Sequence, residues 1–104
     1  MKTSELTEAA LDWAVAQCEE LKLGGLPFLP SKRWDHAGPI IEKEKISLEH
    51  LYGAGDAGED VWVATRMEGP SFSEEQGPTP LIAAMRCYVA ACLGDEIEIP
   101  GELQ

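Results

Sequence analysis

Trp34, Asp35 and His36 place an indole, a carboxylate and an imidazole side by side, a combination that could do chemistry. A carboxylate next to a histidine can form half of an acid–base pair or of a metal site. The other half is missing from the sequence, because His50 is the only other histidine and neither HxH nor HExxH spacing occurs. The cysteines form no CxxC pair, so we expect no metal and no cofactor. We expect Trp34 to be buried and its two neighbours to face water.

Residues 53–58 read GAGDAG, which has the letters of the dinucleotide-binding motif GxGxxG. That motif requires a strand before it and a helix after it, whose N-terminus meets the pyrophosphate. Here a strand is expected to follow, and the carboxylates of Asp56, Glu59 and Asp60 would repel phosphate. The sequence therefore favours a flexible hairpin loop over a nucleotide site.

Arg86 stands alone as a cation in the apolar stretch PLIAAMRCYVAACL, residues 80–93. An arginine in such a helix must reach water or pair with a carboxylate. We predict that Arg86 lies at the rim of the buried face and bridges to a carboxylate of another segment. The candidate partners are Asp12, Asp35 and Glu42. The alternative is a ligand- or partner-binding site in which Arg86 holds a carboxylate or phosphate group. The residues of that site would be Trp34, Asp35, Arg86 and Tyr88.

The elements that position these residues follow from apolar spacing and turn residues. Thr79 and Pro80 are typical of a helix start and Gly94 of a helix end. The expected elements are a helix over 7–21, an irregular connection over 26–39, strands over 46–52 and 61–67 paired as a hairpin across 53–60, a mobile loop over 68–78, a helix over 80–93 and a short strand over 95–100 with Ile97 and Ile99 inward. This order predicts an α+β fold with two helices packed on a small, mostly antiparallel β-sheet. We expect one domain, residues 1–104.

The chain is acidic, with a net charge of −11 at pH 7. Residues 53–104 carry two Lys or Arg against ten Asp or Glu, and residues 1–52 carry six against nine. Because phosphate backbones and anionic membranes attract cations, we expect this chain to bind neither nucleic acid nor membranes. No apolar run approaches the about 18 residues that cross a bilayer, and residues 1–10 lack the apolar segment of a signal peptide. We therefore expect a cytoplasmic location.

The chain resembles the small NinX-like proteins of tailed bacteriophages and prophages. Four stretches carry the resemblance, in the same order: MKTSELTEAALDWAVAQCE, LPSKRWDHAGPIIEKEKISL, VWVA and GPTPLIAAMRCYVAACLGDEIEIP. Residues 53–60 and 66–76 lie outside it. The resemblance implies an accessory product of a phage genome that acts inside a bacterial host. It carries no catalytic or binding residue onto this chain.

Two functions from different classes remain. The first is a non-enzymatic accessory protein that binds a host or phage protein, favoured by the acidic second half and by the lack of a complete catalytic motif. The second is a small-molecule binder or minor enzyme with a pocket around Trp34, Tyr88 and Arg86. A deep pocket with an unpaired Arg86 would favour the second. A homo-oligomer that uses an apolar helix face is a further expectation.

Overall fold

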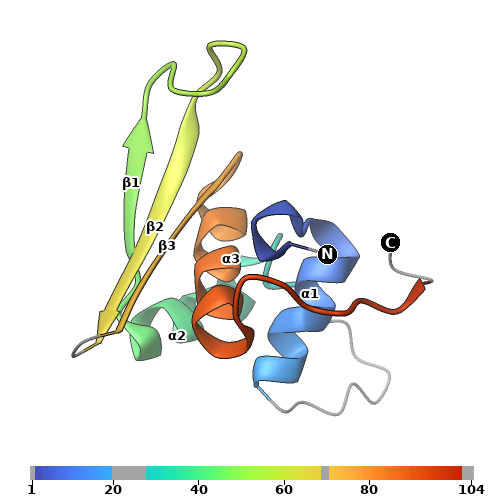
Figure 1. Ribbon diagram of the computed structural model, residues 1–104. Coiled ribbons are helices and arrows are strands. Elements are labelled where there is room, and N and C mark those ends of the chain that lie inside the picture. The colour runs from blue at the N-terminus through green and yellow to red at the C-terminus, as the bar shows by residue number, and fades with distance from the viewer. Residues whose placement is uncertain (1, 20–27, 69–70, 102–104) are drawn as a thin grey trace.

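The computed structural model describes residues 2–19, 28–68 and 71–101 (Figure 1). The elements are a 3-10 turn Thr3–Glu5, α1 Glu8–Cys18, α2 Trp34–Glu44, β1 Ser47–Leu51, β2 Val61–Glu68, β3 Ser71–Gly77 and α3 Pro80–Leu93. The predicted α+β fold is confirmed, but the described residues form three α-helices where two were expected. No helix in these ranges is long and apolar enough to span a membrane.

The sheet has the order β1-β2-β3, and both pairings are antiparallel. The predicted hairpin is confirmed, since Glu49 of β1 lies opposite Val63 of β2. The prediction of a mobile loop over 68–78 is wrong, because β3 pairs with β2 along its length. Phe72 is the only large apolar residue of β3, so this strand lacks the apolar alternation that would mark it in the sequence. Backbone pairing with β2 holds it instead.

The irregular connection predicted over 26–39 is also wrong in its second half, where α2 begins at Trp34 and continues through Pro39. A proline inside a helix removes one backbone hydrogen bond, which is why the sequence indicated a break. Pro39 lies on the exposed side of α2, whereas Ala37 and Ile40 are buried. Burial of these two side chains offsets the lost bond. Residues 20–27, which include the expected glycine end of the first helix, lie outside the described residues.

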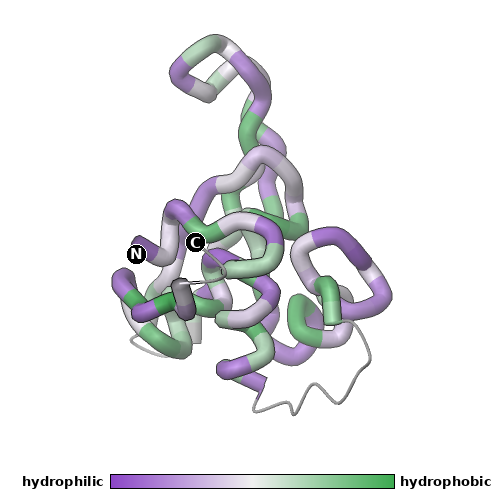
Figure 2. Tube along the Cα trace, turned by 90° about the vertical axis from the view of Figure 1, so that its right-hand side faces the viewer, coloured by the Kyte–Doolittle hydropathy of each residue, from purple (hydrophilic) through white to green (hydrophobic). Residues whose placement is uncertain are grey.

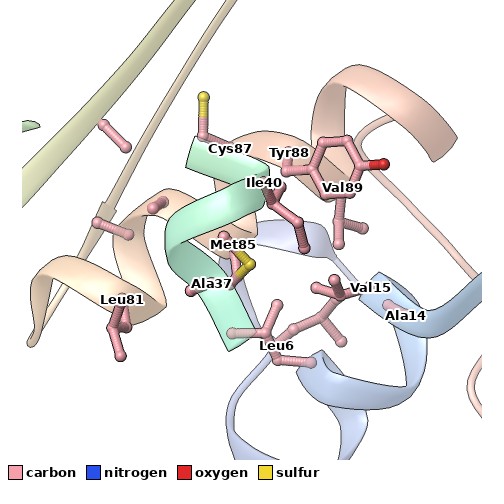
Figure 3. Close-up of a cluster of buried hydrophobic side chains, with 14 of the residues drawn as sticks. Leu6, Ala14, Val15, Ala37, Ile40, Leu81, Met85, Cys87, Tyr88 and Val89 are labelled. Carbon is pink, nitrogen blue, oxygen red and sulfur yellow. The ribbon is translucent and has the colours of Figure 1, made fainter. Parts of the chain in front are cut away.

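Helix α3 lies at the centre of the fold, between the sheet and α1 (Figure 1). Its predicted ends are confirmed: the Thr79 hydroxyl accepts a hydrogen bond from the Ile82 amide at 3.1 Å, Pro80 opens the helix, and Gly94 follows it with a φ of 91°. Side chains from α1, α2, α3 and Leu6 form the buried core shown in Figure 3. This packing explains why α3 is apolar on more than one side.

The short strand predicted over 95–100 does not join the sheet. The structure has a single antiparallel bridge between Lys2 and Glu96 instead. Thr3 ties the two ends of the chain together, because its amide donates to the Asp95 carbonyl at 2.7 Å and its hydroxyl donates to the Gly94 carbonyl at 2.6 Å. Ile99 is buried, as predicted.

Gly77 allows the first turn of α3 to approach the end of β3. A Cβ at this position would lie 2.7 Å from the Ala83 amide nitrogen and 3.1 Å from the Ala83 Cα, both backbone atoms. We expect Gly77→Ala to lower the free energy of unfolding by about 1–3 kcal/mol, as overpacking does. The matched control is Gly38→Ala in α2, where a Cβ meets nothing within 4 Å. It should stabilise by about 0.5–1 kcal/mol. Urea unfolding of both variants measures the difference, and equal midpoints would contradict the close approach.

Candidate functional site

Trp34 and Asp35 lie in the first turn of α2. Trp34 is 55% exposed, so the expectation that it is buried is wrong. Its side chain borders a shallow cleft of about 390 Å³ beside the start of α3. Asp35 forms a bidentate ion pair with Arg33, whose Nε donates to Oδ1 at 3.0 Å and whose Nη2 donates to Oδ2 at 2.8 Å. The Arg33 hydrogen bonds hold the pKa of Asp35 below its ordinary value. His36 is half-buried and accepts a hydrogen bond from the Leu29 amide at 2.9 Å.

Arg86 is half-buried at the edge of the core, as predicted, but the predicted carboxylate bridge is wrong. Its Nε donates to the Leu6 carbonyl and its Nη1 donates to the Gln76 carbonyl, each at 2.8 Å. No described carboxylate forms an ion pair with it. Burial lowers the pKa of Arg86, and the nearby Glu75 opposes that shift. The guanidinium thus joins the segment before α1 to β3 through backbone atoms.

The expected partners of Arg86 are engaged or placed elsewhere. Asp12 accepts a hydrogen bond from the Ser31 amide at 2.8 Å, and burial raises the pKa of its carboxyl. Asp35 is paired with Arg33. Glu42 is an exposed residue of α2. The sequence missed the two carbonyl acceptors because every residue carries one and none has a sequence signal.

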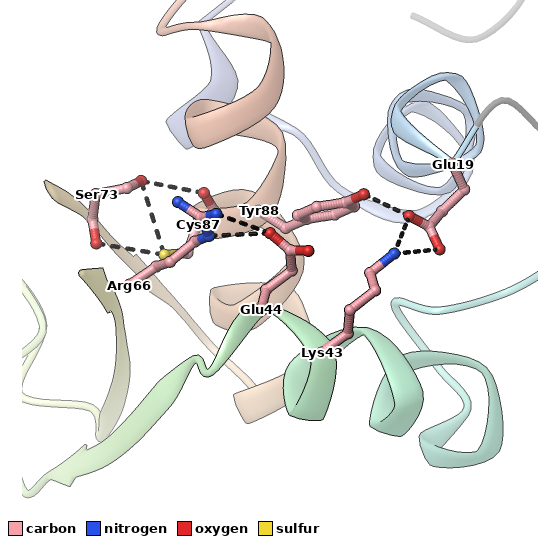
Figure 4. A network of polar contacts seen from close by, with 7 residues as sticks. All are labelled: Glu19, Lys43, Glu44, Arg66, Ser73, Cys87 and Tyr88. Carbon is pink, nitrogen blue, oxygen red and sulfur yellow. Dashed lines mark hydrogen bonds and ion pairs between the residues drawn. The ribbon is translucent and has the colours of Figure 1, made fainter. Parts of the chain in front are cut away.

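Tyr88 is buried, and its hydroxyl donates to the carboxylate of Glu19, which also pairs with Lys43 at 3.0 Å (Figure 4). Burial raises the pKa of Glu19, but the hydrogen bonds from Tyr88 and Lys43 outweigh that effect and lower it overall. Burial and the contact with Glu19 raise the pKa of Tyr88 well above its ordinary value. Tyr88 therefore belongs to a contact between α1, α2 and α3.

The four residues proposed from the sequence are thus not brought into one cavity. Trp34 and Arg86 border different hollows. Tyr88 is two residues from Arg86 on α3, about 200° around the helix, and faces Glu19. Only Trp34 and Asp35, neighbours on α2, remain close. Trp34, Tyr88 and Arg86 therefore do not line a single pocket.

The side of the sheet away from α3 offers a different kind of site. Ala64 belongs to the buried core, and Leu48 and Trp62 pack against that core. Because side chains alternate along a strand, the residues between them point to the opposite side. No helix of the described residues lies on that side (Figure 1). We call this side the outer face; its residues are Ser47, Glu49 and Leu51 of β1, Val61, Val63, Thr65 and Met67 of β2, and Phe72, Glu74 and Gln76 of β3.

The outer face has apolar side chains along β2 and at the start of β3, and carboxylates on the two outer strands. Val63 is 8% exposed, whereas Met67 is 67% and Phe72 62% exposed. These last two lie directly opposite each other in the register of β2 and β3. Glu49 and Glu74 stand on the two outer strands, and none of the ten positions carries a cation. Such a surface suits an apolar partner surface bordered by Lys or Arg.

The β1–β2 loop extends the outer face away from the helices (Figures 1 and 2). It joins two strands, so the interpretation of GAGDAG as a hairpin loop is confirmed and the context for dinucleotide binding is absent from this part of the chain. Gly53 and Gly58 have φ of 62° and 82°, in the left-handed region that glycine tolerates. The Gly53 amide donates to Asp60 at 2.9 Å. The loop is therefore held by its own hydrogen bonds.

An aromatic group lies at the base of this loop. The His50 ring stacks on Trp62 with centroids 4.8 Å apart, and Tyr52 meets it edge-on at 4.3 Å. His50 Nε2 lies 3.1 Å from Asp60 Oδ2. Tyr52 is 83% exposed. No set of three or more His, Cys, Asp or Glu in the described residues is placed to hold a metal ion.

The comparisons with known proteins point to one family. The family model for bacteriophage P22 NinX matches residues 25–91, more than half of the chain. The matched segment runs from the approach to α2 through the whole sheet and most of α3. A search of the curated proteins found no match.

Proposed function

This chain belongs to the bacteriophage P22 NinX family, and on that premise we propose that it is a non-enzymatic phage accessory protein that binds another protein in the host cytoplasm. The uncovered outer face carries the proposal. It combines two exposed, adjacent apolar side chains, Met67 and Phe72, with the carboxylates of Glu49 and Glu74 further along the face. Burying each of those two side chains fully would contribute about 1.5–3 kcal/mol, which is the size of a binding hot spot.

The negative charge of the chain favours a partner protein of opposite charge over a second copy of this chain. A second copy on this face would bring four carboxylates, Glu49 and Glu74 from each chain, to one interface between two molecules of charge −11. Like charges across an interface oppose association. A host or phage protein with a basic, apolar surface fits better. We therefore propose a cationic partner rather than a homo-oligomer.

The outer face is too small to form a stable interface by itself. Three strands about 4.8 Å apart and about seven residues long span on the order of 350 Å². A stable interface takes about 800 Å² from each partner. We therefore expect the partner to reach past the face onto the β1–β2 loop, where Tyr52 is exposed.

The alternative, a small-molecule binder built on Trp34, Arg86 and Tyr88, has less support. Arg86 already donates to two backbone carbonyls, and Tyr88 donates to Glu19. Trp34 borders a cleft without either of them. A ligand could thus be held by at most one of the three residues without rearranging the others.

Affinity capture tests the proposal. We expect the tagged protein to retain a host or phage protein from lysate of phage-carrying cells, and the double variant Met67→Ser/Phe72→Ser to retain at least about tenfold less, because the apolar contact is lost. Both side chains are exposed, so the fold should survive, which circular dichroism checks. The control is Leu93→Ser, a partly exposed leucine at the end of α3. Capture that the double variant leaves unchanged, or that Leu93→Ser reduces equally, would contradict the proposal.

A further inference from the structure

The three α-helices begin around one cleft. Glu8 is the first residue of α1, Trp34 the first of α2 and Pro80 the first of α3. All three line the cleft of about 390 Å³ beside the start of α3. The N-terminus of a helix carries about half a unit of positive charge, because its peptide dipoles are aligned along the axis. Three positive helix ends therefore border one small volume.

Two of these helix starts have no side-chain cap. Thr7 precedes α1 and Arg33 precedes α2, and neither side chain accepts a hydrogen bond from its helix. The start of α3 differs, because the Thr79 hydroxyl accepts from the Ile82 amide. Anions bind at helix starts because amide groups and a positive field meet there. We therefore expect the starts of α1 and α2 to attract an acidic group.

A buried hydroxyl in the same cleft lacks a hydrogen-bond partner. Ser31 lines the cleft and is 5% exposed, and its hydroxyl forms no hydrogen bond within the part of the chain that the structure describes. The nearby Asp12 carboxylate accepts from the Ser31 amide instead, at 2.8 Å. Most buried polar groups in native proteins are paired. An acidic group in the cleft would accept a hydrogen bond from this hydroxyl and supply the missing partner.

The rest of the cleft combines an apolar wall with a charged edge. Leu81 and Ile82 line it, and the indole of Trp34 is 55% exposed at its border. An exposed indole offers a flat surface on which another ring can stack. Lys32 is the one cation among the lining residues, and Glu8 is the one anion. The cleft thus suits a ligand with a flat apolar part and an acidic part.

We propose that this cleft binds a small planar anion, an aromatic ring that carries one carboxylate or phosphate group. The ring stacks on Trp34 beside Leu81 and Ile82, and the acidic group lies toward Ser31 and Lys32. The volume falls in the range of about 300–1,000 Å³ that is usual for small-molecule sites. The chain as a whole has a charge of −11, so the attraction must be local, and the helix starts and Lys32 supply it. The cleft is separate from the outer face, so the site goes beyond the protein binding proposed above.

An NMR titration with three matched probes tests the cleft. The probes are 1-naphthoate, 1-naphthyl phosphate and the neutral 1-naphthamide, which share one ring system. We expect at least one of the two acids to bind about tenfold more tightly than the amide, because hydrogen bonds to a charged group are stronger. The backbone amide signals of positions 8, 34 and 81 should shift most. The acid that binds more tightly identifies the acidic group that the cleft prefers.

Three substitutions in the cleft have different expected effects. Lys32→Ala should weaken binding of the acids about fivefold, and Glu8→Gln should strengthen it, because the two changes remove charges of opposite sign. Trp34→Ala should weaken all three probes about tenfold, because the stacking surface is lost. All three residues are exposed, so the fold should survive, which circular dichroism checks. The control Met67→Ser/Phe72→Ser on the outer face should change nothing.

Several results would overturn the proposal. Equal affinity for the acids and the amide would show that the cleft does not select an anion. Shifts confined to positions 67 and 72 would place the probes on the outer face. Absence of binding at about 10 mM would exclude a site, since a ligand of this size binds at about 1 mM with ordinary efficiency.

Discussion

Replacing Met85 by alanine is expected to lower the free energy of unfolding by about 2–5 kcal/mol, the range for a buried Met, Leu or Ile truncated to Ala. Met85 is fully buried, and Leu6, Val15 and Ala37 surround it in Figure 3. These neighbours come from α1, α2 and the segment before α1, so the cavity cannot close by moving one side chain. Against a total stability of about 5–15 kcal/mol for a natural domain, this loss is large.

Urea denaturation followed by circular dichroism measures this effect. The control is Met85→Leu, which conserves volume and should change stability by less than about 1.5 kcal/mol. If Met85→Ala unfolds at the wild-type midpoint, α1, α2 and α3 do not share one core at this position.

Arg86→Met is expected to lower the free energy of unfolding by about 2–4 kcal/mol, the second-largest effect. The methionine keeps most of the apolar stem but removes both charge-assisted hydrogen bonds, to the Leu6 and Gln76 carbonyls. Each hydrogen bond from a charged group contributes about 1.5–3 kcal/mol, and the bond to Gln76 is exposed and so counts for less. The Leu6 carbonyl would be left partly buried without its donor.

The same substitution at another arginine provides the control. Arg33 is exposed and pairs with Asp35 two residues away, so Arg33→Met should leave the unfolding midpoint unchanged within error. If Arg86→Met were equally harmless, the guanidinium would not be holding β3 to the segment before α1. A gain in stability would instead point to a cation kept for binding.

The elements with local signals were predictable from the sequence. Thr79, Pro80 and Gly94 mark the ends of α3 because capping depends on residues within one turn. The β1–β2 hairpin was equally predictable, since β2 is rich in β-branched residues and a glycine-rich loop separates it from β1. The apolar stretch around Arg86 also indicated a helix buried on several sides, and the residue does lie at its rim.

The elements that depend on distant contacts were not predictable in the same way. Strand β3 has serine, glutamate and glycine at most of its positions, and it is a strand because β2 supplies its hydrogen bonds. Helix α2 contains Pro39, a local signal against a helix that tertiary burial of Ala37 and Ile40 overrides. Local propensity is a weak guide where tertiary packing decides.

The candidate site could be predicted only in part, because one of its strands depends on distant contacts. Val61, Val63 and Met67 alternate with the core-facing residues of β2, so one apolar side of that strand could be recognised. Phe72, which lies opposite Met67, could not be recognised as part of this face, because its segment was expected to be a loop.

Site-specific photo-crosslinking tests the central claim, that the outer face binds a protein partner, most directly. A photoreactive phenylalanine analogue would be placed at position 72 of the protein produced in phage-carrying host cells, and in a second strain at position 93 as the control. We expect a crosslink from position 72 to a protein with a basic surface, lost when Met67→Ser is added, and no such crosslink from position 93. Absence of any crosslink at position 72, or the same product from both positions, would contradict it.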